Sequence, residues 1–335
     1  MRVLITGGTG FVGAHVVRAH LAAGWRVRCA LRASSPRLAL DGLDVEPVEL
    51  PLDQPDALRR ALADVDAVQH VAGIFDPSPG GDERMRRVHV EATRALCQAA
   101  LGQPTPPRVV VCSSSITVGW GSVDAPASEA SPVPDPDRVY GQGNALRAYY
   151  DSKLEAEAVL RHFVDQGLHG VIVNPDYVIG PWDRKPTSGA IILAMAKRWI
   201  PVFPRGGKSF IDAADCGLGH LLALEKGQPG ARYLLGVHNL SYRDFMGRVA
   251  RVVGRSPPLL PMPRTLTGAL GQVGRALNRL PTERFAGLQP QVLSSMQSER
   301  YRSGALAHTH LGLPTTPIEA SIEQAYRWFR DHGYC

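Results

Sequence analysis

Residues 3–13 read Val3-Leu4-Ile5-Thr6-Gly7-Gly8-Thr9-Gly10-Phe11-Val12-Gly13. The apolar run at the start is too short for a helix and rich in β-branched residues, which indicates a strand. Glycines then follow at intervals of three, and apolar side chains recur at helical spacing until Gly24. Glycine allows a tight turn and a close approach of the backbone to a phosphate. Because a helix N-terminus binds the pyrophosphate of a dinucleotide, this stretch predicts a dinucleotide-binding turn rather than an ordinary strand-to-helix connection.

The composition bounds the class of protein. The 335 residues suit one large domain or two closely joined ones. Five scattered cysteines without a Cys-x-x-Cys pair predict reduced thiols in a cytoplasmic protein, and no metal site or disulfide framework. No run of about 18 apolar residues occurs and the first strand starts at the N-terminus, so we expect neither a membrane span nor a signal peptide. The net charge of +6 is spread along the chain, which argues against nucleic-acid binding.

Further strands and helices alternate along the first half of the chain. Strands are expected at 25–31, 45–52, 67–73, 109–112 and 171–173, with helices from 55, over 82–101 and from 144. Strands that are apolar throughout imply a parallel sheet covered on both faces. The sequence therefore predicts an α/β fold, a Rossmann-type doubly wound parallel sheet with a smaller C-terminal substrate lobe. We expect residues 1–174 to form the dinucleotide-binding domain, with strand returns around 208–236, and residues 175–335 to form mainly the interleaved substrate lobe.

The end of the second strand indicates which cofactor is preferred. No Asp or Glu occurs between Gly13 and Asp41, although an NAD-specific site usually has a carboxylate there for the ribose hydroxyl. Arg32 and Arg37 stand there instead, with two serines between them. Guanidinium groups suit the extra phosphate of NADP(H), so we expect NADP(H) to be preferred. If these arginines are only surface charge, NAD(H) remains a candidate.

A reactive constellation follows the fifth strand. Ser113, Ser114 and Ser115 come directly after it, and Tyr149 and Lys153 stand four apart on the next expected helix. Residues four apart share one helical face. A nearby ammonium and a positively charged nicotinamide both favour the phenolate, which would bring the tyrosine pKa toward the working range. Tyr149 is therefore the candidate acid and base; the neighbouring tyrosine at 150 has no lysine four residues on.

Six motifs together resemble one family. They are Thr6-Gly-Gly-Thr-Gly-Phe-Val-Gly13, His70-Val-Ala-Gly73, Ser113-Ser-Ser115, Tyr149 to Lys153, Asn174-Pro-Asp-Tyr-Val-Ile-Gly-Pro181 and Phe210-Ile-Asp-Ala-Ala-Asp215. With them the chain resembles an extended short-chain dehydrogenase/reductase of the NAD-dependent epimerase/dehydratase superfamily. The stretch Gly180-Pro-Trp-Asp-Arg-Lys-Pro-Thr-Ser-Gly189 resembles both the dihydroflavonol-reductase-like group and the hopanoid-associated sugar epimerases.

The resemblance implies roles for the matching residues. Tyr149 would donate and accept the proton, Lys153 would bind the nicotinamide ribose and lower the Tyr149 pKa, and Ser115 would hydrogen-bond the substrate oxygen. Ser113 would replace Ser115 if the strand ends later than expected. Pro175 and Val178 would lie against the nicotinamide, with Thr187 or Ser188 near a phosphate. The residues expected to contact the cofactor are Gly7, Thr9, Gly10, Phe11, Val12, Gly13, Arg32, Arg37, Leu52, Val71, Ala72, Gly73, Ser113, Tyr149, Lys153, Pro175, Val178 and Ser188.

Two positions depart from the family pattern. Pro51 stands where the group usually has an aspartate near the adenine. His89-Val90-Glu91-Ala92-Thr93 stands where members commonly read Asn-Val-x-Gly-Thr. His89 is either a proton relay or substrate contact, or a helix residue that makes the structural hydrogen bond of the asparagine.

Three functions remain open. The first is an NADP(H)-dependent carbonyl reductase or alcohol dehydrogenase for a moderately apolar small molecule, with Tyr149 as the acid. The second is a nucleotide-sugar epimerase with the same site, and the third is a non-catalytic NADP-sensing protein. A dehydratase is disfavoured because Ile116 and Thr117 follow Ser115, where that branch has Asp-Glu. The resemblance also implies a homodimer formed through helices 82–101 and 145–166.

One segment of the second half has two interpretations. Leucines and a valine recur at helical spacing between Pro261 and Pro281, with arginines on the other side. The pattern predicts an amphipathic helix that either packs on its own lobe or serves as a lid or membrane-surface helix.

Overall fold

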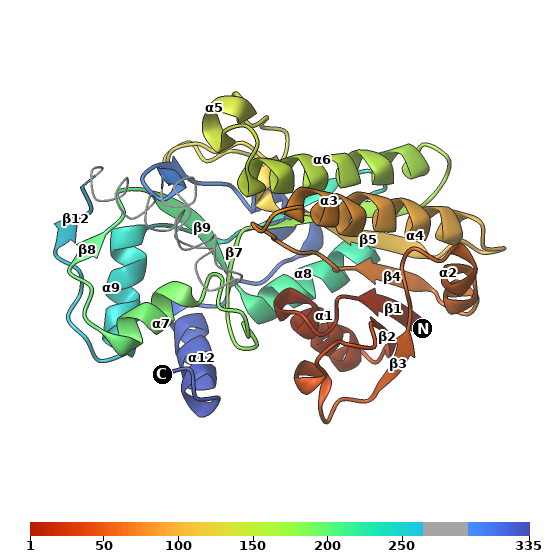
Figure 1. The fold of residues 1–335 in the computed structure, drawn as a ribbon, viewed down its shortest axis with the longest axis horizontal. Helices are drawn as coiled ribbons and strands as arrows, with labels where there is room; N and C mark the ends of the chain where they lie inside the picture. The colour runs from red at the N-terminus through yellow and green to blue at the C-terminus, as the bar shows by residue number, and fades with distance from the viewer. Residues whose placement is uncertain (264–293) are drawn as a thin grey trace.

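A parallel sheet forms the centre of the larger lobe (Figure 1). The computed structural model describes residues 1–263 and 294–335. Seven strands follow the order β10-β6-β5-β4-β1-β2-β3, and each neighbouring pair is parallel. The strands are β1 Arg2–Thr6, β2 Arg26–Leu31, β3 Val45–Glu49, β4 Ala67–His70, β5 Arg108–Cys112, β6 Gly170–Pro175 and β10 Arg232–Leu235. This confirms the Rossmann-type fold.

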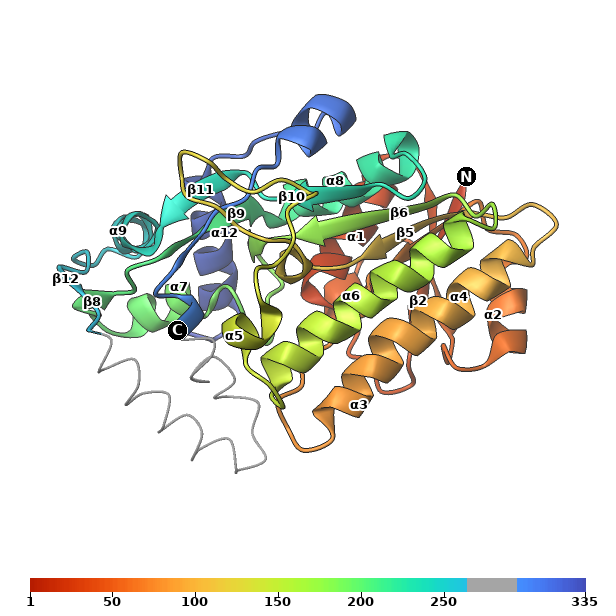
Figure 2. The same ribbon diagram turned by 90° about the horizontal axis from the view of Figure 1, so that it is seen from above.

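Helices cover both faces of this sheet (Figure 2). One face packs against α1 Phe11–Ala22 and α8 Ala213–Lys226, and the other against α2 Pro55–Leu62, α4 Ala92–Leu101 and α6 Ala145–Val164. Alternate side chains of a strand point to opposite faces, so Val3 and Ile5 join the first core and Leu4 joins the second. Because both faces of the sheet centre are buried, the central strands β1, β5 and β6 each carry an uninterrupted apolar run.

Some expected boundaries differ from those observed. The third strand ends at Glu49, because Leu50 N still donates to Leu31 O but the next residue is Pro51, which has no N–H. The fourth strand ends at His70. The helix expected over 82–101 is α3 Gly81–Arg86, a π-helical turn Arg87–Glu91 and α4. A π-turn re-aims side chains, here including that of His89.

The second lobe is built on a smaller sheet. In it β9 Gly207–Asp212 pairs with β7 Tyr177–Ile179, β11 His238–Ser241 and β13 Glu299–Arg300. The helices α7 Ala190–Lys197, α9 Tyr242–Val252 and α12 Ile318–Asp331 pack beside it around Phe210 and Phe245. Short elements complete the described chain: β8 Val202–Phe203 paired with β12 Leu260–Pro261, α5 Pro136–Tyr140, and the turns Leu38–Leu40, Ser115–Thr117 and Ala307–Leu311. Most of the helix expected between residues 261 and 281 lies outside the described residues.

Candidate active site

The turn between β1 and α1 is shaped to accept a phosphate. Gly7 has a φ of +72°, and a Cβ there would lie 2.7 Å from Ala72 N. A Cβ on Gly13 would lie 2.1 Å from Gly7 O. Gly10 precedes α1 and, among the described residues, no side chain caps the first turn, so its N–H groups and the positive end of the helix dipole have no described side-chain acceptor. The turn, including the partly exposed Thr9, Phe11 and Val12, fits the pyrophosphate of a dinucleotide.

The end of β2 presents positive charge to solvent. Arg32 and Arg37 are both exposed, and neither forms an ion pair within the described residues. Ser35 Oγ accepts a hydrogen bond from Arg32 N at 3.0 Å, which shapes the turn after the strand. Such groups fit an additional phosphate better than a ribose hydroxyl.

The segment after β4 forms a second wall beside the glycine turn. Ala72 N donates to Thr6 Oγ1 at 3.2 Å, and Val71 N donates to Thr6 O at 3.2 Å. Val71 and Ala72 are partly exposed, as is Leu52 after β3, whereas Gly73 is exposed. A Cβ on Gly73 would lie 3.2 Å from the Lys153 Nζ atom, so the wall runs from the glycine turn to that lysine.

Tyr149 and Lys153 share one face of α6. Asn144 caps this helix, as expected, by accepting hydrogen bonds from Leu146 N and Arg147 N. The Lys153 Nζ atom lies 6.0 Å from the centre of the Tyr149 ring and donates to Cys112 O at 2.9 Å. The α6 helix therefore presents a phenol and a buried ammonium at the end of β5.

The pKa of Tyr149 is not lowered in this structure. Burial raises it to about 12, opposed by a hydrogen bond with the Ser114 side chain. Burial also lowers the pKa of Lys153, whose ammonium is directed at the Cys112 carbonyl. The phenol is consequently protonated at neutral pH, and the depression expected from Lys153 is absent.

The three serines after β5 have three different partners. Ser114, which the sequence did not single out as a contact, hydrogen-bonds Tyr149. Ser115 is buried and its hydrogen bond to the Asp176 carboxylate helps to lower the pKa of that group. Ser113 Oγ donates to Glu157 Oε1 at 2.6 Å. The assignment of Ser115 to the substrate oxygen therefore stays a prediction, and Ser114 joins it as a candidate.

Glu157 is a site residue that the sequence reasoning missed. Its side chain is fully buried, and Oε1 accepts hydrogen bonds from Thr117 at 2.7 Å and Asn174 at 2.8 Å besides Ser113. Its Oε2 atom pairs with Arg232 and, at 3.2 Å, with Arg161. The available signal was its spacing, four residues beyond Lys153 on the same helical face.

Both ring nitrogens of His89 are engaged. The Nε2 atom accepts from Ile74 N at 3.1 Å, so the proton is on Nδ1, which lies 2.9 Å from Ser152 Oγ. Burial, followed by the charge of Lys153, lowers the pKa of His89 to about 2. The ring packs edge-on against Tyr149 with centroids 5.5 Å apart. These contacts support the structural alternative for His89 over a proton relay.

The remaining expected contacts lie around β7. Pro175 and Val178 are buried. Ser188 is also buried and its hydroxyl donates to Val178 O, whereas Thr187 N donates to the Asp183 carboxylate at 2.9 Å. The Ser188 hydroxyl is thus already bonded to the backbone, and its contact with a phosphate stays a prediction.

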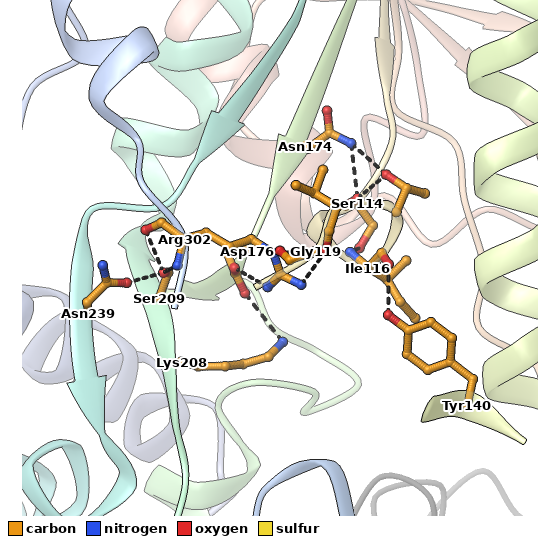
Figure 3. Close-up of polar contacts among 12 residues, drawn as sticks. Ser114, Ile116, Gly119, Tyr140, Asn174, Asp176, Lys208, Ser209, Asn239 and Arg302 are labelled. Carbon is orange, nitrogen blue, oxygen red and sulfur yellow. Dashed lines mark hydrogen bonds and ion pairs between the residues drawn. The ribbon is translucent and has the colours of Figure 1, made fainter. Parts of the chain in front are cut away.

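A buried ionic network joins the loop after β5 to the second lobe (Figure 3). Asp176 pairs with Arg302 Nη1 at 2.8 Å and with Lys208 Nζ at 3.3 Å. Arg302 also donates through Nε to Gly119 O at 2.9 Å and through Nη2 to Val118 O at 2.9 Å. Although burial opposes it, these cations lower the pKa of Asp176, and the carboxylate is ionised. The network holds the serine-bearing loop against the small sheet.

Within residues 1–263 and 294–335, no helix combines the length and the apolar character needed to cross a membrane.

Known proteins resemble this chain over nearly its whole length. Residues 3–236 match the model of the NAD dependent epimerase/dehydratase family. A Synechocystis sp. protein provisionally named dihydroflavonol 4-reductase is 33% identical over 98% of this chain and 95% of its own. Sterol demethylase protein B of Methylococcus capsulatus is 32% identical over 99% of both chains. The solved structure of a nucleoside-diphosphate-sugar epimerase from Pseudomonas aeruginosa has a TM-score of 0.79 and 28% identity, covering 100% of this chain and 99% of that one. The chain therefore belongs to the NAD-dependent epimerase/dehydratase family and is an NAD(P)-dependent enzyme of the extended short-chain dehydrogenase/reductase type.

Proposed function

We propose that this enzyme is an NADP(H)-dependent carbonyl reductase or alcohol dehydrogenase for a moderately apolar small molecule. The observation that carries the proposal is the placement of Tyr149. Its hydroxyl bonds Ser114, and Lys153 lies on the same helical face, beside the wall formed by residues 71–73. The Synechocystis sp. relative, which is similar to this chain over nearly its full length, is named as a reductase, and this supports the same reaction class.

The residues of this site have separate tasks. When bound, the nicotinamide supplies or takes up a hydride. Tyr149 gives a proton to the substrate oxygen in reduction and removes it in oxidation. With a pKa of about 12 it is protonated at pH 7 and ready to act as an acid. The Ser114 and Ser115 hydroxyls would orient the substrate oxygen, while buried Lys153 would hold the cofactor ribose next to Tyr149.

We assign the preference for NADP(H) to the end of β2. Arg32 and Arg37 are exposed there and no described carboxylate pairs with them. Comparison of the Michaelis constants for NADPH and NADH tests this assignment. R32A should raise the Michaelis constant for NADPH by about tenfold and leave that for NADH nearly unchanged. A clear preference of the wild type for NADH would contradict it.

Nucleotide-sugar epimerisation is the second candidate. It is favoured by the likeness to a solved nucleoside-diphosphate-sugar epimerase and by Arg300 of the small sheet, a cation with no ion pair among the described residues. In that reaction the same Tyr149 would serve both halves of an oxidation and re-reduction, and cofactor would not be consumed.

One assay separates these functions. The protein is incubated with NADPH and a panel of ketones while cofactor absorbance is followed, and with nucleotide sugars while their interconversion is measured. Net NADPH oxidation supports the reductase, and sugar interconversion without it supports the epimerase. Neither reaction, with NADPH still bound, would indicate a cofactor-sensing protein.

The proton donor is tested by Y149F. We expect kcat to fall by about 10² to 10⁴, since a positioned acid contributes that much, while the dissociation constant for NADPH stays within about twofold. Y150F is the matched control, because the Tyr150 ring packs against that of Tyr140 with centroids 5.0 Å apart. Unchanged turnover in Y149F would refute the assignment.

A further inference from the structure

Where the small sheet faces the loop after β5, cationic side chains outnumber carboxylates among the described residues. Arg300 of β13 and Lys208 of β9 are register partners in a parallel pair, so their side chains leave the same face of the sheet. The Asp176 carboxylate takes up the charges of Lys208 and Arg302, with one oxygen facing each (Figure 3). Arg300 is left without an ion pair among the described residues.

Aromatic rings hold the Arg300 guanidinium in place. Its central carbon lies 4.3 Å from the centre of the Trp120 ring and 5.9 Å from that of Tyr140. Such stacking occupies the face of a guanidinium and leaves its N–H groups, which lie in the plane, able to donate. None of the described residues accepts a hydrogen bond from Arg300 Nε, which is buried. Leaving a buried donor unsatisfied is costly, so an acceptor oxygen that reached this guanidinium would recover free energy.

The guanidinium lines a pocket of about 340 Å³. Trp120, Ser294, Ser298 and Arg138 also line it, and these contribute two hydroxyl groups and a second guanidinium. Among the described lining residues the one carboxylate is that of Asp135, which accepts from Arg138 N at 3.2 Å as the cap of α5. The lining is therefore positive and rich in hydrogen-bond donors.

The pocket adjoins the active-site loop. Tyr140, which flanks Arg300, donates its hydroxyl to Ile116 O at 2.9 Å, and Trp120 belongs to the same loop. That loop also carries Ser114, the partner of Tyr149. An occupant of the pocket would thus be placed by the same segment that places the reacting oxygen.

We propose that Arg300, stacked between Trp120 and Tyr140, forms an oxyanion-binding subsite that takes a carboxylate or phosphate group of the substrate. A planar fork of N–H donors matches either group, and both share the required charge and acceptor oxygens. The assignment to a substrate rests on the proposed function, whereas the binding of an oxyanion does not.

Anion binding is measured first, without turnover. Thermal unfolding of the full-length protein is followed in sodium phosphate, sodium acetate and sodium chloride at equal ionic strength. We expect phosphate or acetate to raise the wild-type midpoint by about 2 °C or more over chloride, and the larger rise identifies the preferred oxyanion. R300Q should show a smaller rise than the wild type, since only the part due to this subsite is lost, and R300K should lie between the two. The control R327Q, an exposed arginine paired with Glu323 on α12, should behave as wild type. Equal responses of wild type and R300Q would overturn the subsite.

The substrate class is measured second, with matched ketones. A keto acid and its methyl ester are compared as substrates with NADPH. We expect the acid to be favoured in kcat/KM by about 10- to 100-fold, the range of a charged hydrogen bond, and R300Q to remove this preference while sparing the ester. An equal preference in R300Q would overturn the link to the substrate. If no ketone is reduced by wild type, the proposed function fails, and the unfolding measurement still decides the subsite.

Discussion

Glu157 shows how one buried side chain ties the reactive loop to the helix that carries Tyr149. Its carboxylate bonds Ser113 and Thr117 after β5 and Asn174 at the end of β6. It also neutralises Arg232, which is largely buried. A buried carboxylate of this kind is stabilising only while all its partners are present.

Removing this charge should destabilise the protein. E157Q keeps the size of the side chain but leaves Arg232 uncompensated and replaces one acceptor oxygen by an amide. We expect the free energy of unfolding to fall by about 3 kcal/mol, as in other buried ion pairs that lose one partner. Urea unfolding measures the change. E155Q is the control on the same helix, because Glu155 is partly exposed and its pair with Arg86 should be worth less than about 1 kcal/mol. Equal losses in the two variants would contradict the role of burial.

The position of the serines at 113–115 could be predicted from the sequence, but their hydrogen-bond partners could not. Their position after β5 was predictable, because a buried strand ends at Cys112 and reacting groups lie at the carboxyl edge of such sheets. Which hydroxyl meets Tyr149 was not predictable. Between the end of β5 and the 3₁₀ turn Ser115–Thr117, the hydroxyls of Ser113, Ser114 and Ser115 meet Glu157, Tyr149 and Asp176 in turn.

Among the elements, the turn from β1 to α1 is the one most dependent on glycine. A Cβ on Gly13 would meet the Gly7 carbonyl oxygen at 2.1 Å, so the turn could not keep its shape. We therefore expect G13A to raise the dissociation constant for NADPH by at least about tenfold, because the helix N-terminus can no longer approach the pyrophosphate.

Fluorescence titration with NADPH measures this effect. G247A is the matched control, since Gly247 lies within α9 and no atom of the described residues stands within 4 Å of the Cβ it would carry. Alanine is the better helix former, so G247A should be neutral or stabilising by about 1 kcal/mol. An unaltered affinity in G13A would show that this turn does not hold the cofactor.

The helix that carries His89 could be predicted only in part. Apolar periodicity indicated one helix over 82–101, whereas the structure has a π-helical turn at 87–91. The spacing of apolar residues does not reveal the extra residue that a π-helical turn contains. The contacts that favour this π-helical turn also come from outside the helix. It brings His89 between Ile74 N and Ser152 Oγ, two partners from other elements.

For the molecule as a whole, buried histidines predict sensitivity to acid. Burial lowers the pKa of five of them, to about 4, 3, 2 and 4 for His20, His70, His89 and His220, and below its usual value for His15. Below about pH 6.5 the unfolded chain binds protons at these positions and the folded chain does not. The stability that these neutral, buried histidines contribute is therefore fully present above pH 6.5 and is lost as the pH falls below that value. Asp183 and Asp215, whose pKa burial raises, contribute with the opposite sign but are outnumbered.

The expected loss is about 1.4 kcal/mol per pH unit for each buried histidine between its unfolded and folded pKa. Urea unfolding at pH 8, 7, 6 and 5 should show constant stability at first and a steep decline below pH 6.5. H89Q, whose amide oxygen can take the place of Nε2 and accept from Ile74 N, should reduce the slope by one histidine, and H162Q at an exposed position should not. A flat profile between pH 7 and pH 5 would contradict this view of the core.

The sequence by itself determined the parallel sheet, the glycine turn and the shared face of Tyr149 and Lys153. Each depends on residues close in the chain, and strand and helix periodicities express local geometry directly. Only the tertiary structure decided the partners of the three serines, the convergence on Glu157 and the pairing of Asp176 with Arg302, 126 residues away. Those contacts require separate strands, helices and the small sheet to meet, and a buried charge finds its partner wherever packing brings one, not at a fixed spacing along the chain.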